Sequence, residues 1–156
     1  MKKTKNGFSL IELLIVVAII LIIAAIAIPN LIKSKMAANE ASAVGSVRTV
    51  NTGEVNYAAT CPGIGYSTTL AQLNNGGCAA ATGIIDAVLS AGAKSGYTFV
   101  EAGVQGADNL NDTYTVTARP AVLGTTGQRM FCSDQTGVIR YTLTGAGCTG
   151  GSAPLQ

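Results

Sequence analysis

Apolar residues are concentrated at the start of the chain. From Phe8 to Ile28 there are 21 residues, of which only Ser9 and Glu12 are polar. At ~1.5 Å per residue a helix of this length spans ~31 Å, which matches the ~30 Å hydrocarbon thickness of a bilayer. The pattern predicts a membrane-spanning helix over residues 8–29, with one carboxylate near its beginning.

A proline and a second, weaker apolar pattern follow. Pro29 lacks a backbone donor and clashes with the preceding turn, so a kink or local melting is expected near Ala25–Pro29. Helical character then resumes over residues 30–59, with an expected end at Tyr57–Ala59. Three- and four-residue steps define an apolar stripe there: Ala37, Ala41, Val44, Val47 and Val50. Four polar residues fall off that stripe: Lys35, Asn39, Glu40 and Arg48.

The remaining residues, 60–156, show short helical and strand patterns. A capped helical turn is predicted at Ser67–Asn74, and a short helix at Thr82–Ser90 with Ile84, Ile85, Val88 and Leu89 available to pack. Four segments rich in Tyr, Thr, Val and Phe predict strands: Ser95–Ala102, Asp112–Ala118, Gln128–Ser133 and Gly137–Thr144. We therefore expect an α+β fold, with a long N-terminal helix packed on a roughly four-stranded antiparallel sheet.

The distribution of charged residues predicts how the chain is oriented in the membrane. Three of the ten basic residues, Lys2, Lys3 and Lys5, precede the apolar segment, which leaves seven basic and eight acidic residues from position 8 onward. By the positive-inside rule the N-terminus should stay in the cytoplasm. The later basic residues are scattered, so no specific nucleic-acid partner is expected.

The carboxylate of Glu12 separates three interpretations of the apolar segment. A secretory signal peptide would use Ala25-Ile26-Ala27 as its cleavage site, but its apolar core would be unusually long. A plain membrane anchor would merely tolerate the charge. If the chain were instead cut between Gly7 and Phe8, the new α-amine would lie one helical turn from Glu12. Neighbouring copies could then pair amine with carboxylate, which would fix their axial register.

The segment Gly7-Phe8-Ser9-Leu10-Ile11-Glu12, behind a Lys-rich leader, resembles the type III signal of type IV pilins and pseudopilins. The resemblance implies cleavage after Gly7 by the prepilin peptidase, N-methylation of Phe8, and pairing of Glu12 with a neighbour's amine. Pro29 falls where that family commonly has a helix-bending proline. The family's pilin-like fold also has a long helix packed on an antiparallel sheet.

Four cysteines, Cys61, Cys78, Cys132 and Cys148, follow the apolar segment. None forms a C-x-x-C pair and the chain has no histidine, so a zinc site is poorly supported. Four separated cysteines behind a membrane span predict two disulfides outside the cytoplasm. Three pairings are possible, and we favour the local one, Cys61–Cys78 with Cys132–Cys148, because it closes two short loops.

Other candidate sites are weak. Asp108, Asn111 and Asp112 predict a polar hairpin turn, with calcium binding by their oxygens as the alternative. Asn111-Asp112-Thr113 also matches a glycosylation acceptor triplet. The chain lacks a histidine base and a recognisable nucleophile motif, so we expect neither enzyme activity nor a cofactor.

The expected protein is therefore a structural subunit of a type IV pilus filament. Four regions are predicted: a cleaved leader (1–7), a transmembrane and filament-core helix (8–29), an amphipathic helix (30–59) and a periplasmic or extracellular head (60–156). Its expected partners are copies of itself, the prepilin peptidase and methyltransferase, the inner-membrane assembly machinery and, before assembly, the lipid bilayer. The final location would be a surface pilus or a periplasmic pseudopilus. The alternatives are a type II secretion pseudopilin and, less expected, a membrane-anchored periplasmic binding module.

Overall fold

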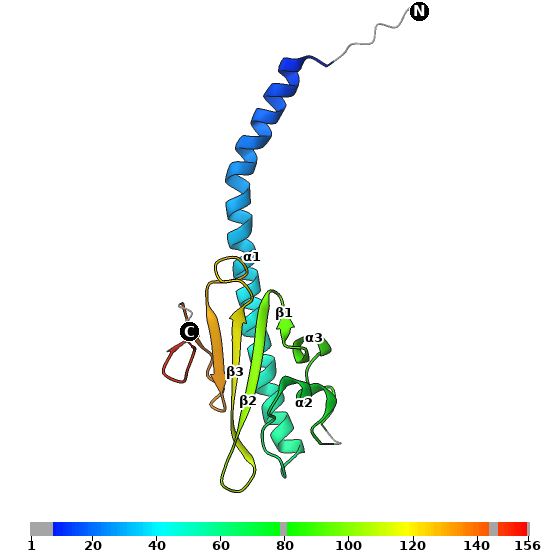
Figure 1. The fold of residues 1–156 in the computed structure, drawn as a ribbon, viewed down its shortest axis with the longest axis vertical. Helices are drawn as coiled ribbons and strands as arrows, with labels where there is room; N and C mark the ends of the chain where they lie inside the picture. The colour runs from blue at the N-terminus through cyan, green and yellow to red at the C-terminus, as the bar shows by residue number, and fades with distance from the viewer. Residues whose placement is uncertain (1–7, 79–80, 144–146, 156) are drawn as a thin grey trace, which may run out of the picture. The chain divides into compact units, whose positions relative to one another are not determined.

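The computed structural model describes residues 8–78, 81–143 and 147–155. Its first element is α1 (Leu10–Thr60), a helix of 51 residues that ends one residue beyond the expected limit (Figure 1). The helix is continuous through Pro29, so the local melting considered near Ala25–Pro29 does not occur. A proline removes one hydrogen bond of the ladder, and the Asn30 side-chain amide donates to the Ile26 carbonyl at 3.1 Å beside it. A kink at Pro29 stays a prediction.

The chain divides into two compact units, Met1–Lys35 and Met36–Gln156. The described part of the first unit is the apolar portion of α1. The second unit, called the head below, contains the rest of α1 and, among its described residues, two short helices, α2 (Leu70–Asn75) and α3 (Ala87–Ser90). Its described residues also form six strands: β1 (Ala93–Lys94), β2 (Tyr97–Gln105), β3 (Asn111–Pro120), β4 (Met130–Asp134), β5 (Arg140–Thr142) and β6 (Ala153–Pro154).

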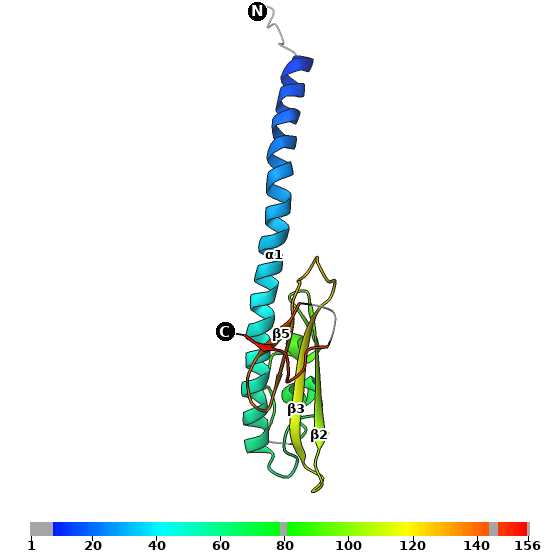
Figure 2. The same cartoon turned by 90° about the vertical axis from the view of Figure 1, so that its left-hand side faces the viewer.

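The six strands form one antiparallel meander in the order β1-β2-β3-β4-β5-β6. The four predicted strands correspond to β2–β5, and two strands of two residues each extend the sheet at its edges. The α+β, pilin-like fold expected from the sequence is thus confirmed. Figures 1 and 2 show β2 and β3 running beside the cyan-to-green part of α1.

The predicted helix Thr82–Ser90 is too long at its beginning. Gly83 has a φ of +68°, which is outside the helical range, and the helix starts only after Asp86. The Asp86 carboxylate accepts a hydrogen bond from the Leu89 N–H at 2.9 Å, as an N-cap residue does. Leu89 is buried, but Val88 is 57% exposed and does not contribute the packing that was expected of it.

Residues at alternating three- and four-residue steps form the buried face of α1 in the head: Glu40, Ala43, Val47, Val50, Glu54 and Tyr57. The predicted stripe is correct at Val47 and Val50 but wrong at Ala37 and Ala41, which are exposed. This face packs against the alternating inner side chains of the sheet, including Tyr97, Phe99, Val116 and Phe131. Because Glu40 lies within the face, its placement off the stripe was also wrong.

Two glycines of α1 predict opposite responses to alanine. A Cβ at Gly45 would meet nothing within 4 Å, whereas a Cβ at Gly53 would lie 3.1 Å from Ile84 Cγ2 and 3.4 Å from Ile85 Cγ2. We expect Gly45→Ala to raise the free energy of unfolding by ~0.5–1 kcal/mol, the difference in helix propensity. Gly53→Ala should gain less or lose stability, because Ile84 must move. Thermal unfolding of the two single variants checks this, and an equal gain in both would contradict it.

Candidate membrane and assembly segment

The beginning of α1 is organised by a local hydrogen bond. Ser9 precedes the first helical residue, and its backbone N–H donates to Glu12 Oε2 at 2.9 Å. This is half of a capping box, in which the third residue of a helix satisfies the N–H of the N-cap residue. The negative charge also lies in the first turn, where it interacts favourably with the helix dipole. Glu12 therefore has a role within a single chain.

The segment that follows presents apolar side chains on every side. Residues 8–32 are exposed except for the half-buried Ala24, and Phe8 is 85% exposed. By length and composition α1 is the one helix, among the described residues, that could cross a membrane. Burying a single Leu, Ile or Phe side chain is worth ~1.5–3 kcal/mol, so this surface requires lipid or other apolar helices around it.

The structure brings only part of the predicted processing and assembly site into view. Glu12 lies in the exposed first turn of α1 and Phe8 is exposed just before the helix begins, whereas Gly7 and the leader lysines lie outside the described residues. A carboxylate has two acceptor oxygens. The bond from Ser9 therefore leaves Glu12 able to accept from a second donor, such as an amine of another chain.

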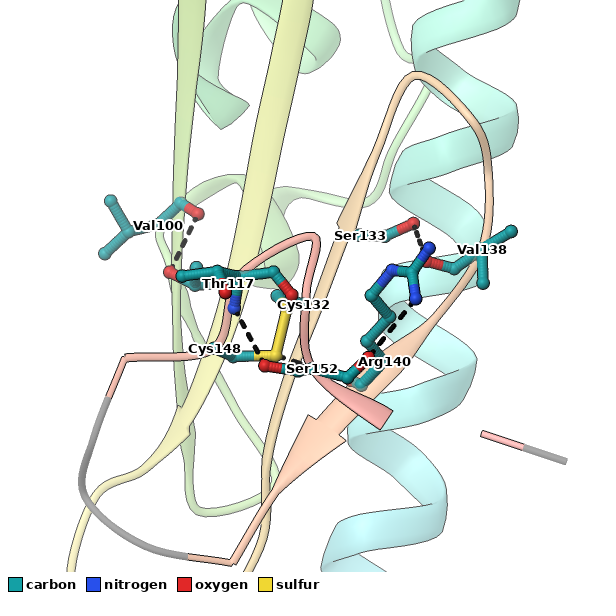
Figure 3. Close-up of a disulfide and its surroundings, with 9 residues drawn as sticks. Val100, Thr117, Cys132, Ser133, Val138, Arg140, Cys148 and Ser152 are labelled. Carbon is teal, nitrogen blue, oxygen red and sulfur yellow. Dashed lines mark hydrogen bonds between the residues drawn. A yellow bond between two sulfur atoms is a disulfide. The ribbon is translucent and has the colours of Figure 1, made fainter. Parts of the chain in front are cut away.

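Both predicted disulfides are present in the head. Cys61–Cys78 joins the residue after α1 to the segment after α2, and Cys132–Cys148 joins β4 to the connection between β5 and β6. Figure 3 shows the second disulfide beside Thr117 and Arg140. The Arg140 guanidinium donates from Nη1 to the Ser152 carbonyl at 3.2 Å, which ties the same connection to β5. The local pairing favoured from loop length is confirmed.

Asp108 of the calcium candidate lies in the turn between β2 and β3, whereas Asn111 and Asp112 are the first two residues of β3. Asp108 Oδ1 accepts from the Leu110 N–H at 3.1 Å, and the Asn111 side-chain amide donates to the Tyr66 carbonyl at 2.8 Å. The expected polar hairpin turn is thus observed. Among the described residues there is no group of three or more His, Cys, Asp or Glu that could hold a metal ion. The bond to Tyr66 also occupies the amide nitrogen that glycosylation of Asn111 would use.

An ion pair that was not predicted from the sequence joins α1 to the end of the β3–β4 connection. Glu40 accepts bonds from the Gln128 N–H at 2.8 Å, the Arg129 N–H at 3.2 Å and Arg129 Nε at 2.8 Å. Burial opposes ionisation of Glu40, but these bonds outweigh it and hold the pKa of the carboxyl below its ordinary value. The Arg129 guanidinium also lies 5.5 Å from the ring centre of Phe131 and 5.6 Å from that of Tyr141.

An exposed apolar helix continuous with a disulfide-bonded α+β head fits a protein that is anchored in a membrane by its N-terminal segment. Comparison with known families agrees: residues 2–28 match the model described as the prokaryotic N-terminal methylation motif. The chain thus carries the type IV prepilin signal, and the motif supports a type IV pilin or pseudopilin, which suggests a structural protein. The motif implies processing by prepilin peptidase and assembly into pili. Searches of curated proteins and of solved structures each found no match.

Proposed function

We propose that this chain is the structural subunit of a type IV pilus filament. It is made as an inner-membrane precursor, cleaved after Gly7, N-methylated at Phe8 and polymerised through its N-terminal helix. The observation that carries the proposal is that the residues matching the methylation motif coincide with a helix whose apolar side chains are exposed. Such a helix is stable in the bilayer before assembly and among identical helices afterwards.

Glu12 sets the register between subunits in this proposal. In the single chain its carboxylate accepts from its own Ser9. Cleavage before Phe8 creates a cationic amine, and a neighbour's amine can donate to the same carboxylate in surroundings of low dielectric constant. Because the contact is head to tail and does not close on itself, its repetition generates a helical filament.

The topology follows from the charges and the cysteines. The leader lysines keep the N-terminus in the cytoplasm, and the head lies on the other side of the inner membrane. Two disulfides in the head support an oxidising compartment for it. The prepilin peptidase and methyltransferase act from the membrane, the inner-membrane machinery assembles the filament, and the heads form its surface.

A pseudopilin of a type II secretion system is the second candidate, since it carries the same signal and the same kind of helix. The two candidates differ in where the filament ends. A pilus extends from the cell surface, whereas a pseudopilus stays in the periplasm. Loss of surface fibres on deletion of the gene supports the pilus, and loss of protein secretion without loss of fibres supports the pseudopilin.

The deciding experiment is the intact mass and N-terminal residue of the protein in material sheared from the cell surface. We expect a chain that begins at Phe8, carries one additional methyl group on its amine and is lighter by two hydrogens for each disulfide. A sheared chain that begins after Ala27 would show a secretory signal peptide. A chain that keeps Met1 and is found only in membranes would show a plain anchor.

A further inference from the structure

Two glutamates from distant parts of the sequence meet inside the head. Glu54 on α1 has no exposed surface, and Glu101 on β2 is 7% exposed. The segment before α2 covers them: a Cβ at Gly103, two residues after Glu101, would lie 2.5 Å from the Ser67 carbonyl oxygen. The two carboxyl groups are therefore enclosed by three segments of the chain packed against one another.

The hydrogen bonds indicate different protonation states for the two carboxyl groups. Both oxygens of Glu54 accept from Ser67, Oε2 from its N–H at 2.9 Å and Oε1 from its hydroxyl at 2.5 Å. Two such donors are what a carboxylate needs. The two carboxyl oxygens of Glu101 are buried without a hydrogen bond of good geometry among the described residues, and the Ser67 hydroxyl that acts on this group already donates to Glu54. Its neighbour is the Glu54 carboxyl, which can only accept while it is ionised.

The groups around the pair do not supply a counter-charge. Tyr57 on α1 interacts electrostatically with Glu54, and Tyr114 on β3 interacts with both glutamates. Tyr114 is in turn acted on by Tyr66 in the segment before α2 and by Asp134 on β4. Among the described residues, no lysine or arginine acts on Glu101 or Tyr114. Two ionised carboxylates side by side would be both desolvated and mutually repelled.

We propose that Glu54 and Glu101 share one proton, with the neutral Glu101 carboxyl donating a hydrogen bond to the Glu54 carboxylate, so that a proton fastens β2 to α1. Removal of this proton leaves two buried negative charges between these elements. The shared proton therefore makes the folded head sensitive to alkaline conditions.

The direction of the pH dependence follows from proton linkage. Burial, with the Glu54 carboxylate adding to it, raises the pKa of Glu101 from 4.5 to about 10, although Ser67 partly opposes this. Below pH 4.5 both the folded and the unfolded chain keep the proton, and the stabilisation is fully present. Above pH 4.5 only the folded chain keeps it, so the free energy of unfolding falls as the pH rises toward 10. One proton released on unfolding changes the equilibrium constant tenfold per pH unit.

The test is the unfolding of the full chain in detergent at several pH values between 6 and 9. Glu101→Gln keeps a donor to Glu54 and cannot ionise, so it should unfold less readily than the unmodified chain at pH 9. Its unfolding equilibrium constant should also change less steeply with pH than that of the unmodified chain, by a factor of ten per pH unit. Asp108→Asn is the matched control, because it removes an exposed carboxylate and keeps the acceptor oxygen for Leu110. The control should retain the original slope.

Two further measurements make the result decisive. Carbon-13 spectra of the unmodified chain labelled at glutamate Cδ should show one protonated carboxyl at pH 7 that is missing from Glu101→Gln. A fully ionised set of glutamates at pH 7, or equal slopes in Glu101→Gln and the unmodified chain, overturns the proposal even if a variant folds poorly. If millimolar CaCl2 or MgCl2 stabilises the unmodified chain but not Glu101→Gln, a bound cation rather than a proton lies between the two carboxyl groups. That result also overturns the proposal.

Discussion

Glu12→Leu should still be inserted into the membrane and cleaved after Gly7, but should not enter filaments. The leucine makes the membrane span more apolar, so insertion has no reason to fail. In a filament, however, the amine of a neighbouring Phe8 would be buried without its partner, at a cost on the order of 3–5 kcal/mol per subunit. The measurement is the mass of the protein in membrane and sheared fractions of cells that express only the variant.

The hydrogen bond between Ser9 and Glu12 calls for a second substitution, because leucine removes the helix cap together with the charge. Glutamine at this position preserves the cap but has no charge. If intersubunit charge pairing is the role of Glu12, Glu12→Gln should fail to assemble as Glu12→Leu does. Sheared filaments of Glu12→Gln at the original yield would show that capping within the chain is the role. Gly7→Leu should fail earlier and accumulate as the uncleaved precursor.

Glu40→Ala should lower the free energy of unfolding of the head by about 2–4 kcal/mol. The substitution leaves the backbone N–H groups of Gln128 and Arg129 without their acceptor and removes the partner of the Arg129 side chain. Solvent reduces the last contribution, since the Arg129 side chain is 37% exposed. Chemical denaturation of the full chain in detergent measures the change.

The control for Glu40→Ala is Lys94→Ala. Lys94 and Asp86 form an ion pair at 2.9 Å, nearly the same separation as the 2.8 Å of Arg129 and Glu40, but both side chains are about a third exposed or more. Removing Lys94 should cost only about 0–1 kcal/mol. Because the pKa of Glu40 is lowered on folding, its stabilisation is present above pH 4.5 and disappears as the pH falls below that value. Equal losses in the two variants, or an unchanged acid response in Glu40→Ala, would contradict this account.

The sequence predicted the long helix, the four main strands and the disulfide pairing because these depend on patterns within short segments. It did not predict β1 and β6, since two residues carry no alternation that could be recognised. Gly83 and Asp86 carried the signals that delay the start of α3, a glycine outside helical φ and a capping carboxylate. They were outweighed by the apolar residues around them.

The two buried glutamates of α1 were missed for a different reason. Charged residues are usually assigned to the solvent side of an amphipathic helix, yet Glu40 and Glu54 lie at the same three- and four-residue spacing as Val47 and Val50. Their hydrogen-bond donors include Arg129, 89 residues after Glu40, and Ser67, 13 residues after Glu54, so only the folded chain reveals why burial is tolerated. At the N-terminus the cap could have been recognised, because Ser9 stands three residues before Glu12.

The two local disulfides limit how far the head can be stretched by a pulling force. Each bond closes a loop, with a sequence separation of 17 for Cys61–Cys78 and 16 for Cys132–Cys148. At ~3.5 Å per extended residue, roughly 60 Å and 55 Å of contour length are withheld while the bonds are intact. A subunit that unfolds under tension would therefore release these two lengths of chain only after its disulfides are reduced. A fibre made of such heads would resist elongation through covalent bonds as well as through the stability of the fold.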